Sequence, residues 1–75
     1  MTNEDKSLIA FGKRVADLRR KSGYTQESLA EKIGMSAHSL AFIEQGRRWP
    51  RLKTLHRLAK GIGVSTDELF RGLRQ

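Results

Sequence analysis

The fold of this chain is decided by the stretch Thr25-Gln-Glu-Ser-Leu-Ala-Glu-Lys-Ile-Gly-Met-Ser-Ala-His-Ser-Leu-Ala-Phe-Ile-Glu-Gln-Gly46. Thr25 can cap a helix by accepting a hydrogen bond from an unpaired backbone N–H group. Gly34 can end that helix, because glycine adopts a left-handed conformation without strain. Ser36 can then cap a second helix that runs to Gly46. The stretch therefore predicts two short helices joined by a tight turn, a helix-turn-helix.

Each of these two helices has one apolar face. Leu29, Ala30 and Ile33 form the inner face of the first, and Leu40 and Ile43 form that of the second. Such faces must be buried against other elements. We therefore expect the rest of the chain to hold the two helices at a fixed angle.

Apolar periodicity and capping residues predict three more helices. A helix is expected over roughly residues 6–22, with Gly23 as its stop. Pro50 suits the first turn of a fourth helix, whose inner face is expected to hold Leu52, Leu55, Leu58, Ala59 and Ile62. A capping box over 65–68 starts a fifth helix. The expected fold is an all-α, compact five-helix domain over residues 6–75, with residues 1–5 disordered.

Length and composition restrict the class of protein. The chain has 75 residues, which suits one small domain of limited intrinsic stability, and it has no cysteine. Disulfides and thiolate metal sites are thereby excluded, and two distant histidines make a poor metal site. We expect no metal and no cofactor, and additional support from a second subunit. No signal peptide and no apolar run of about 18 residues is present, so a cytoplasmic location is expected.

Charge points to a polyanionic partner. Fifteen Lys and Arg oppose eight Asp and Glu, which gives a formal net charge of +7. A basic excess of this kind is typical of nucleic-acid binding proteins. The sequence contains no nucleophile–base pair, carboxylate pair or phosphate-cradling glycine loop, so it is not expected to be an enzyme.

The predicted third helix has an unusual outer face. At about 100° per residue, the side opposite Leu40 and Ile43 carries His38, Phe42 and Gln45. A merely solvated face would carry more charge. An aromatic side chain there suits contact with a thymine methyl group in the major groove. The alternative for Phe42 is sideways packing against a neighbouring helix or a second subunit.

Other residues in and next to the two predicted helices of the helix-turn-helix suit contacts with DNA. His38 can bond a base edge or a phosphate, and Ala37 and Ser39 lie on the flanks of the same face. The candidate phosphate contacts are Gln26, Ser36, Gln45, Arg47 and Arg48. Capping alone, a surface amide or a solvated basic loop would explain some of these equally well.

Glu44 is an exception, because it is acidic and lies near the core side of the helix. It should have a cation close by. Arg19, on the inner flank of the first helix, is the candidate partner. A buried Arg–Glu pair would fix geometry more than it adds stability.

Several motifs together resemble one family. The carrying elements are Val15-x-x-Leu18-Arg19, Gly23-Tyr-Thr-Gln26-x-x-Leu29-Ala30, Gly34-x-Ser36, Leu40-x-x-Ile43-Glu44-x-Gly46, Pro50 and Val64-Ser-x-Asp-x-Leu69. The chain resembles the Cro/C1-type, XRE-like helix-turn-helix family, which includes phage repressors and restriction–modification controller proteins. The resemblance implies a lambda-repressor-like domain in which Gln26 contacts phosphate.

The resemblance also implies base contacts for Ala37, His38 and Phe42, with Ser39 nearby, and an Arg19–Glu44 bridge. Two departures from the family pattern matter. Ala37 can offer only a methyl group, and Phe42 replaces a residue that often makes hydrogen bonds. Base selection is therefore expected to use methyl contacts and DNA shape.

The expected function is sequence-specific regulation of transcription, by a homodimer on a near-palindromic double-stranded operator in the nucleoid. Helix five and the loop before helix four, with Trp49, Phe70 and Leu73, are expected to form the dimer surface. RNA polymerase is a further potential partner. The alternative is an antitoxin that binds a toxin and represses its own promoter. A basic RNA or membrane-surface binder is the third interpretation, although no membrane insertion is expected.

Overall fold

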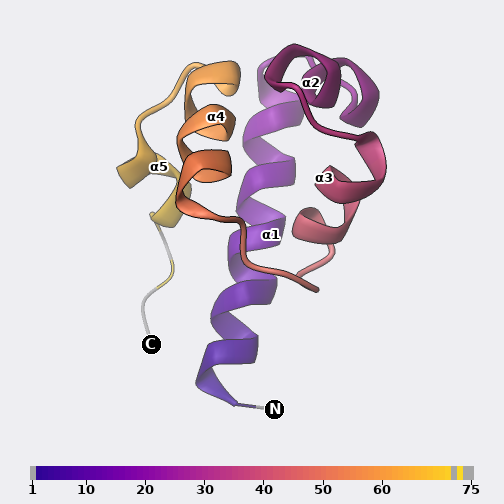
Figure 1. The fold of residues 1–75 in the computed structure, drawn as a ribbon. Coiled ribbons are helices and arrows are strands. Elements are labelled where there is room, and N and C mark those ends of the chain that lie inside the picture. The colour runs from indigo at the N-terminus through magenta and orange to yellow at the C-terminus, as the bar shows by residue number, and fades with distance from the viewer. Residues whose placement is uncertain (1, 72, 74–75) are drawn as a thin grey trace.

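The computed structural model describes residues 2–71 and 73, which form five helices and contain no strand. These are α1 (Asn3–Lys21), α2 (Gln26–Ile33), α3 (Ala37–Glu44), α4 (Leu52–Ile62) and α5 (Thr66–Phe70). Figure 1 shows α1 running through the middle, with α2 and α3 on one side and α4 and α5 on the other. The prediction of a compact all-α five-helix fold is confirmed.

The first helix begins earlier than the sequence suggested. Thr2 Oγ1 accepts a hydrogen bond from Asp5 N at 3.0 Å, and Asp5 Oδ2 accepts one from Thr2 N at 3.2 Å. This capping box gives hydrogen-bond partners to backbone N–H groups at the start of the helix, which would otherwise be unpaired. The predicted disordered segment over 1–5 is therefore corrected, since residues 3–5 are helical, while residue 1 lies outside the described residues.

The start of α4 also differs from the prediction. Pro50 lies before the helix and not in its first turn, because Arg51 keeps an extended backbone with φ −68° and ψ 158°. The segment before Arg51 brings the Trp49 ring to 5.2 Å from the Phe11 ring. Leu52, expected to face inward, is 69% exposed. It occupies the first turn, where the apolar stripe of α4 reaches the edge of the core.

The fifth helix keeps half of its predicted capping box. Ser65 Oγ accepts from Glu68 N at 3.2 Å. The Glu68 carboxylate accepts instead from Arg14 of α1 at 3.2 Å, and Arg14 Nε also donates to the Glu68 carbonyl oxygen at 3.0 Å. These bonds fasten α5 to α1.

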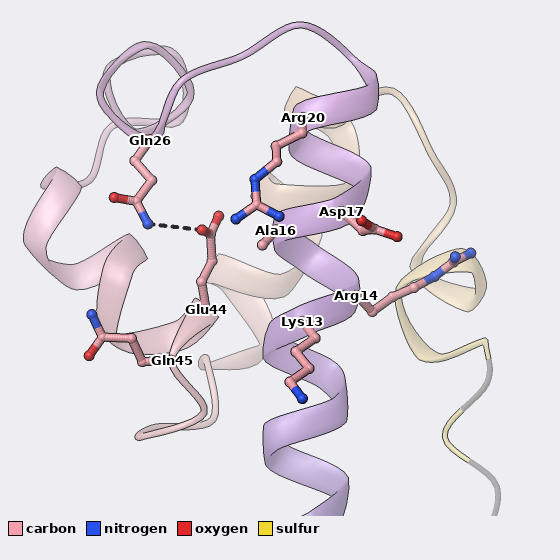
Figure 2. A pocket seen from close by; sticks show the side chains of 8 residues that line it. All are labelled: Lys13, Arg14, Ala16, Asp17, Arg20, Gln26, Glu44 and Gln45. Atoms are coloured by element: carbon pink, nitrogen blue, oxygen red, sulfur yellow. Dashed lines mark hydrogen bonds between the residues drawn. The ribbon is translucent and has the colours of Figure 1, made fainter.

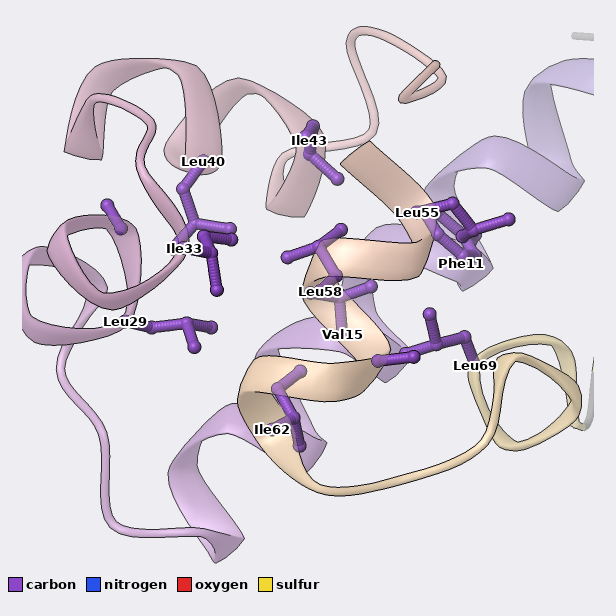
Figure 3. Packing of buried hydrophobic residues seen from close by; sticks show 12 residues of the cluster. Phe11, Val15, Leu29, Ile33, Leu40, Ile43, Leu55, Leu58, Ile62 and Leu69 are labelled. Atoms are coloured by element: carbon purple, nitrogen blue, oxygen red, sulfur yellow. The ribbon is translucent and has the colours of Figure 1, made fainter. Parts of the chain in front are cut away.

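All five helices contribute to one core. The fully buried large side chains are Phe11 and Val15 of α1, Leu29 of α2, Leu40 of α3, Leu58 of α4 and Leu69 of α5. Figure 3 shows them converging between the helices. Burying each such side chain contributes about 1.5–3 kcal/mol. The two helices of the central motif are therefore anchored by the same cluster that holds the remaining three.

Two glycines let α3 lie unusually close to α1. A Cβ atom on Gly12 would lie 2.6 Å from the carbonyl oxygens of both Ile43 and Glu44. One on Gly46, whose φ is +73°, would lie 2.8 Å from the Cα atom of Ile9. The end of α3 therefore packs so close to α1 that only glycine fits at positions 12 and 46.

We expect Gly12→Ala to lower the free energy of unfolding by about 1–3 kcal/mol, because backbone carbonyls cannot yield as a flexible side chain can. The better helix propensity of alanine offsets only about 1 kcal/mol of that loss. Thermal unfolding followed by circular dichroism measures the effect, and Asp17→Ala, at an exposed site on the same helix, is the control. A melting temperature for Gly12→Ala equal to that of wild type would show that the helices have room to separate.

Candidate nucleic-acid interface

An ion pair joins α1 to α3. Arg19 Nε donates to Glu44 Oε2 at 2.7 Å, and Arg19 Nη2 donates to Glu44 Oε1 at 3.0 Å. The two side chains are only 8% and 5% exposed. Arg19 Nη1 also donates to the Tyr24 carbonyl oxygen at 2.9 Å, which ties the turn before α2 to the same guanidinium. The predicted partners are thus together, in a two-bond geometry that leaves little freedom of rotation.

Gln26 is bound to this pair. Its Nε2 atom donates to Glu44 Oε1 at 2.9 Å (Figure 2). Thr25 caps α2, with Thr25 Oγ1 accepting from Ser28 N at 2.9 Å, so Gln26 is the first residue of the helix. An amide nitrogen carries two hydrogens, and only one is used here. The second hydrogen and the backbone N–H at the helix start remain suited to an anionic group.

The outer face of α3 contains exposed polar side chains. Leu40 and Ile43 are buried, whereas His38, Ser39 and Gln45 are exposed. Ser36 lies before the helix, where its Oγ atom accepts from Ser39 N at 3.0 Å and donates to Ser39 Oγ at 2.9 Å. Its observed role is capping, which also holds the Ser39 hydroxyl at the start of the helix.

Two predicted base contacts are less exposed than the helix angle suggested. Ala37 is half-buried and packs against the core. Phe42 is also half-buried, with its ring centroid 4.5 Å from that of His38 and 5.2 Å from the guanidinium carbon of Arg47. Side chains at i and i+4 meet on one helix face, which explains the contact with His38. Phe42 therefore presents part of its ring and not a free aromatic face.

A polar cleft of about 520 Å³ lies between α1 and the α2–α3 unit. Figure 2 shows Lys13 and Arg20 of α1 on one side, Gln26 and Gln45 on the other, and Glu44 between them. Arg14 also lines the cleft, and its guanidinium turns toward Glu68, to which it donates. Lys13 and Arg20 are exposed cations that the sequence analysis did not select. Their spacing, with Asp17 between them, places them on one helix face and is the signal that could have identified them.

The loop after α3 adds positive charge. Arg47 and Arg48 are both exposed. A groove of about 440 Å³ between α3, this loop and α4 is lined by Arg48, Arg51 and Arg57 together with Ser39 and Phe42. Cations therefore flank the outer face of α3 beyond its last turn, while Gln26 flanks its other side.

The residues predicted for a dimer surface lie around Phe11. Trp49 and Phe70 are 38% and 40% exposed, and each ring centroid is 5.2 Å from that of Phe11. Leu73 is half-buried and packs against the core of its own subunit. The exposed Leu52, which the sequence assigned to the core, is the third large apolar side chain at the described surface.

Among residues 2–71 and 73, none of the helices combines the length and the apolar character that a membrane span requires.

The chain is similar in sequence to proteins that are named as transcriptional regulators. A helix-turn-helix family model matches residues 15–69. The chain is 39% identical over 62 residues to the SPbeta prophage-derived HTH-type transcriptional regulator YonR of Bacillus subtilis, covering 83% of this chain and 57% of YonR. It is 45% identical over 58 residues to the HTH-type transcriptional regulator y4dJ of Sinorhizobium fredii, covering 77% and 75%.

A solved structure is similar over most of both chains. The restriction-modification controller protein C.AhdI from Aeromonas hydrophila matches with a TM-score of 0.84 and 32% identity, over 87% of this chain and 98% of that one. The curated relatives differ more in length. The chain spans 57% of YonR and 49% of the Bacillus subtilis regulator ImmR.

We expect Glu44→Ala to cost about 3–5 kcal/mol of unfolding free energy, because it leaves the Arg19 guanidinium buried without a counter-charge. Glu44→Gln keeps the shape and one acceptor and should lose less. The double variant Arg19→Met, Glu44→Leu should recover part of the loss, since no charge is then buried. Urea unfolding of the three variants measures the series. Equal stability of Glu44→Gln and Glu44→Ala would show that the hydrogen bonds to this carboxylate contribute little.

Proposed function

This chain belongs to the helix-turn-helix family, and on that premise we propose that it is a DNA-binding transcriptional regulator that binds a near-palindromic operator as a homodimer. Its relatives are transcriptional regulators and not enzymes, in agreement with the prediction that the chain is not an enzyme. A protein that acts on DNA in this way would work in the cytoplasm, at the nucleoid.

The observation that carries the proposal is the outer face of α3. His38, Ser39 and Gln45 are exposed on it, while Leu40 and Ile43 hold the opposite side in the core. A helix with one side fixed and the other offered to solvent can enter a major groove as a rigid body. In our proposal His38, Ser39 and the accessible parts of Ala37 and Phe42 contact base edges.

Phosphate contacts would set the position of this helix on the duplex. The proposed contacts are Gln26, Ser36, Gln45 and Arg48, which surround the outer face of α3. To these we add Lys13 and Arg20, because they share the cleft with Gln26 and Gln45. The net charge of +7 supports a large share of salt-dependent affinity.

The dimer is proposed from the remaining apolar surface. Trp49, Leu52 and Phe70 are the large hydrophobic side chains exposed in the described chain. In the proposed dimer these side chains are buried against a second copy, and the two α3 helices enter successive major grooves about 34 Å apart. Leu73 would support Phe70 from within its own subunit. Occupation of such an operator would block RNA polymerase at an overlapping promoter.

Selection of duplexes from a random pool tests the regulator directly. We expect enrichment of a half-site repeated in inverted orientation, with centres about 10 base pairs or a multiple of it apart. Binding to the enriched duplex should exceed binding to a shuffled duplex by at least about 10³-fold. Both titrations are followed by fluorescence anisotropy at several salt concentrations. A pool without enriched sites would rule out the proposed function.

Leu52→Lys tests the dimer with little risk to the fold, because this side chain is 69% exposed in the subunit. We expect sedimentation equilibrium to show a monomer where the wild type is a dimer, with the helical circular dichroism signal of the subunit retained. Operator affinity should fall because the two half-sites are then bound independently. Lys53→Arg, which keeps the charge at the next exposed position of α4, is the matched control. A wild-type association constant for Leu52→Lys would exclude this surface.

A further inference from the structure

Arg47 occupies a special place at the end of α3. Gly46 has φ +73°, and its N–H group donates to the Ile43 carbonyl oxygen at 3.1 Å. The N–H group of Arg47 donates to the Phe42 carbonyl oxygen at 3.0 Å. This left-handed termination turns the chain back over the last turn of the helix. The backbone of Arg47 is therefore fixed directly beyond Phe42.

The Arg47 side chain then lies against the aromatic ring. Its guanidinium carbon is over the Phe42 ring, 5.2 Å from the centroid, and the His38 ring lies 4.5 Å from the same centroid. His38 precedes Phe42 by one turn and Arg47 follows it, so the ring has a neighbour toward each end of the helix. Attraction between the cation and the ring face limits the positions that the guanidinium can adopt.

The contact with Phe42 does not use the hydrogen-bonding groups of Arg47. A cation–π contact engages the ring through the charge of the guanidinium, so its N–H donors are still available to other acceptors. No carboxylate among residues 2–71 and 73 forms a salt bridge with Arg47. An arginine held in this way can donate two parallel hydrogen bonds to O6 and N7 of guanine, the commonest specific contact of arginine in the major groove.

We propose that Arg47 is a specificity-determining residue that reads a guanine, with Phe42 as the residue that positions it. This inference rests on the proposed function and assigns Arg47 a base contact in place of the phosphate contact predicted from the sequence. Phosphate oxygens recur at every step of the backbone, whereas a guanine offers O6 and N7 at one place in the groove, so restricted motion of the guanidinium matters more for the base contact. Arg48, the next residue, is exposed and has no ring contact within the described chain, so it fits the phosphate role.

The experiment compares Arg47→Ala and Arg48→Ala on the duplex enriched by selection and on a shuffled duplex. For Arg47→Ala we expect affinity for the enriched duplex to fall about fivefold to a hundredfold more than affinity for the shuffled one. For Arg48→Ala we expect both affinities to fall by the same factor, with a smaller salt slope. Arg47→Lys keeps the charge and should lose much of the same discrimination, because a lysine lacks the planar fork.

Modified bases identify the atom that is read. Replacing the guanines of the half-site one at a time by 7-deazaguanine removes the N7 acceptor. At one position this change should weaken binding by the wild type and leave binding by Arg47→Ala unchanged. Phe42→Leu removes the ring, and in that background the additional substitution Arg47→Lys should cause little further loss of discrimination. Thermal melting of each protein verifies that the fold is retained.

The outcomes separate the two proposals. An enriched site on which Arg47→Ala and Arg48→Ala behave alike overturns the role of Arg47 and leaves the regulator intact. A half-site in which no guanine responds to 7-deazaguanine through Arg47 has the same consequence. A pool that yields no enriched site overturns the regulator and, with it, this inference.

Discussion

One buried ion pair fixes the helix-turn-helix part of this protein. Arg19 of α1 donates twice to Glu44 of α3, and Gln26 of α2 donates to the same carboxylate. Three helices therefore meet at one carboxyl group, and directional bonds set their relative orientation where apolar packing alone would permit sliding. Charge burial contributes little net stability compared with a well-packed apolar pair. Its value here lies in geometry, because Gln26 and α3 are held as one unit.

Close helix contact complements that pair. Gly12 lets the carbonyl groups of Ile43 and Glu44 approach α1, and Gly46 lets the turn after α3 approach the backbone of Ile9. Backbone contact thereby sets how closely α3 approaches α1. The bonds to the Glu44 carboxylate set the rotation of α3 about its own axis. The outer face of α3 can then carry polar and aromatic side chains, since none of them is needed to hold the helix.

Much of the fold could be predicted from the sequence because its signals are local. Thr25, Ser36 and Ser65 cap helices, and Gly23 and Gly34 end them, through bonds within a few residues. One error was local, since the capping box of Thr2 with Asp5 starts α1 inside the segment expected to be disordered. Other errors occurred where the packing of the folded chain decided the outcome. Leu52 has the right spacing for the core yet is exposed at its edge. The Glu68 carboxylate was expected to complete a capping box, but it binds Arg14 of α1 instead.

The sequence by itself determined the five helices, their inner faces apart from Leu52, and the pairing of Arg19 with Glu44. Helical period and charge balance indicate these features without knowledge of packing. The arrangement of side chains at the interface was decided by the folded structure. The angle around the helix places Phe42 opposite the core, but the turn at Gly46 brings the guanidinium of Arg47 over the Phe42 ring. Lys13 and Arg20 join the same cleft as Gln26 only because α1 packs beside the ends of α2 and α3. Helix angle fixes the direction of a side chain, whereas packing between distant segments fixes what that side chain meets.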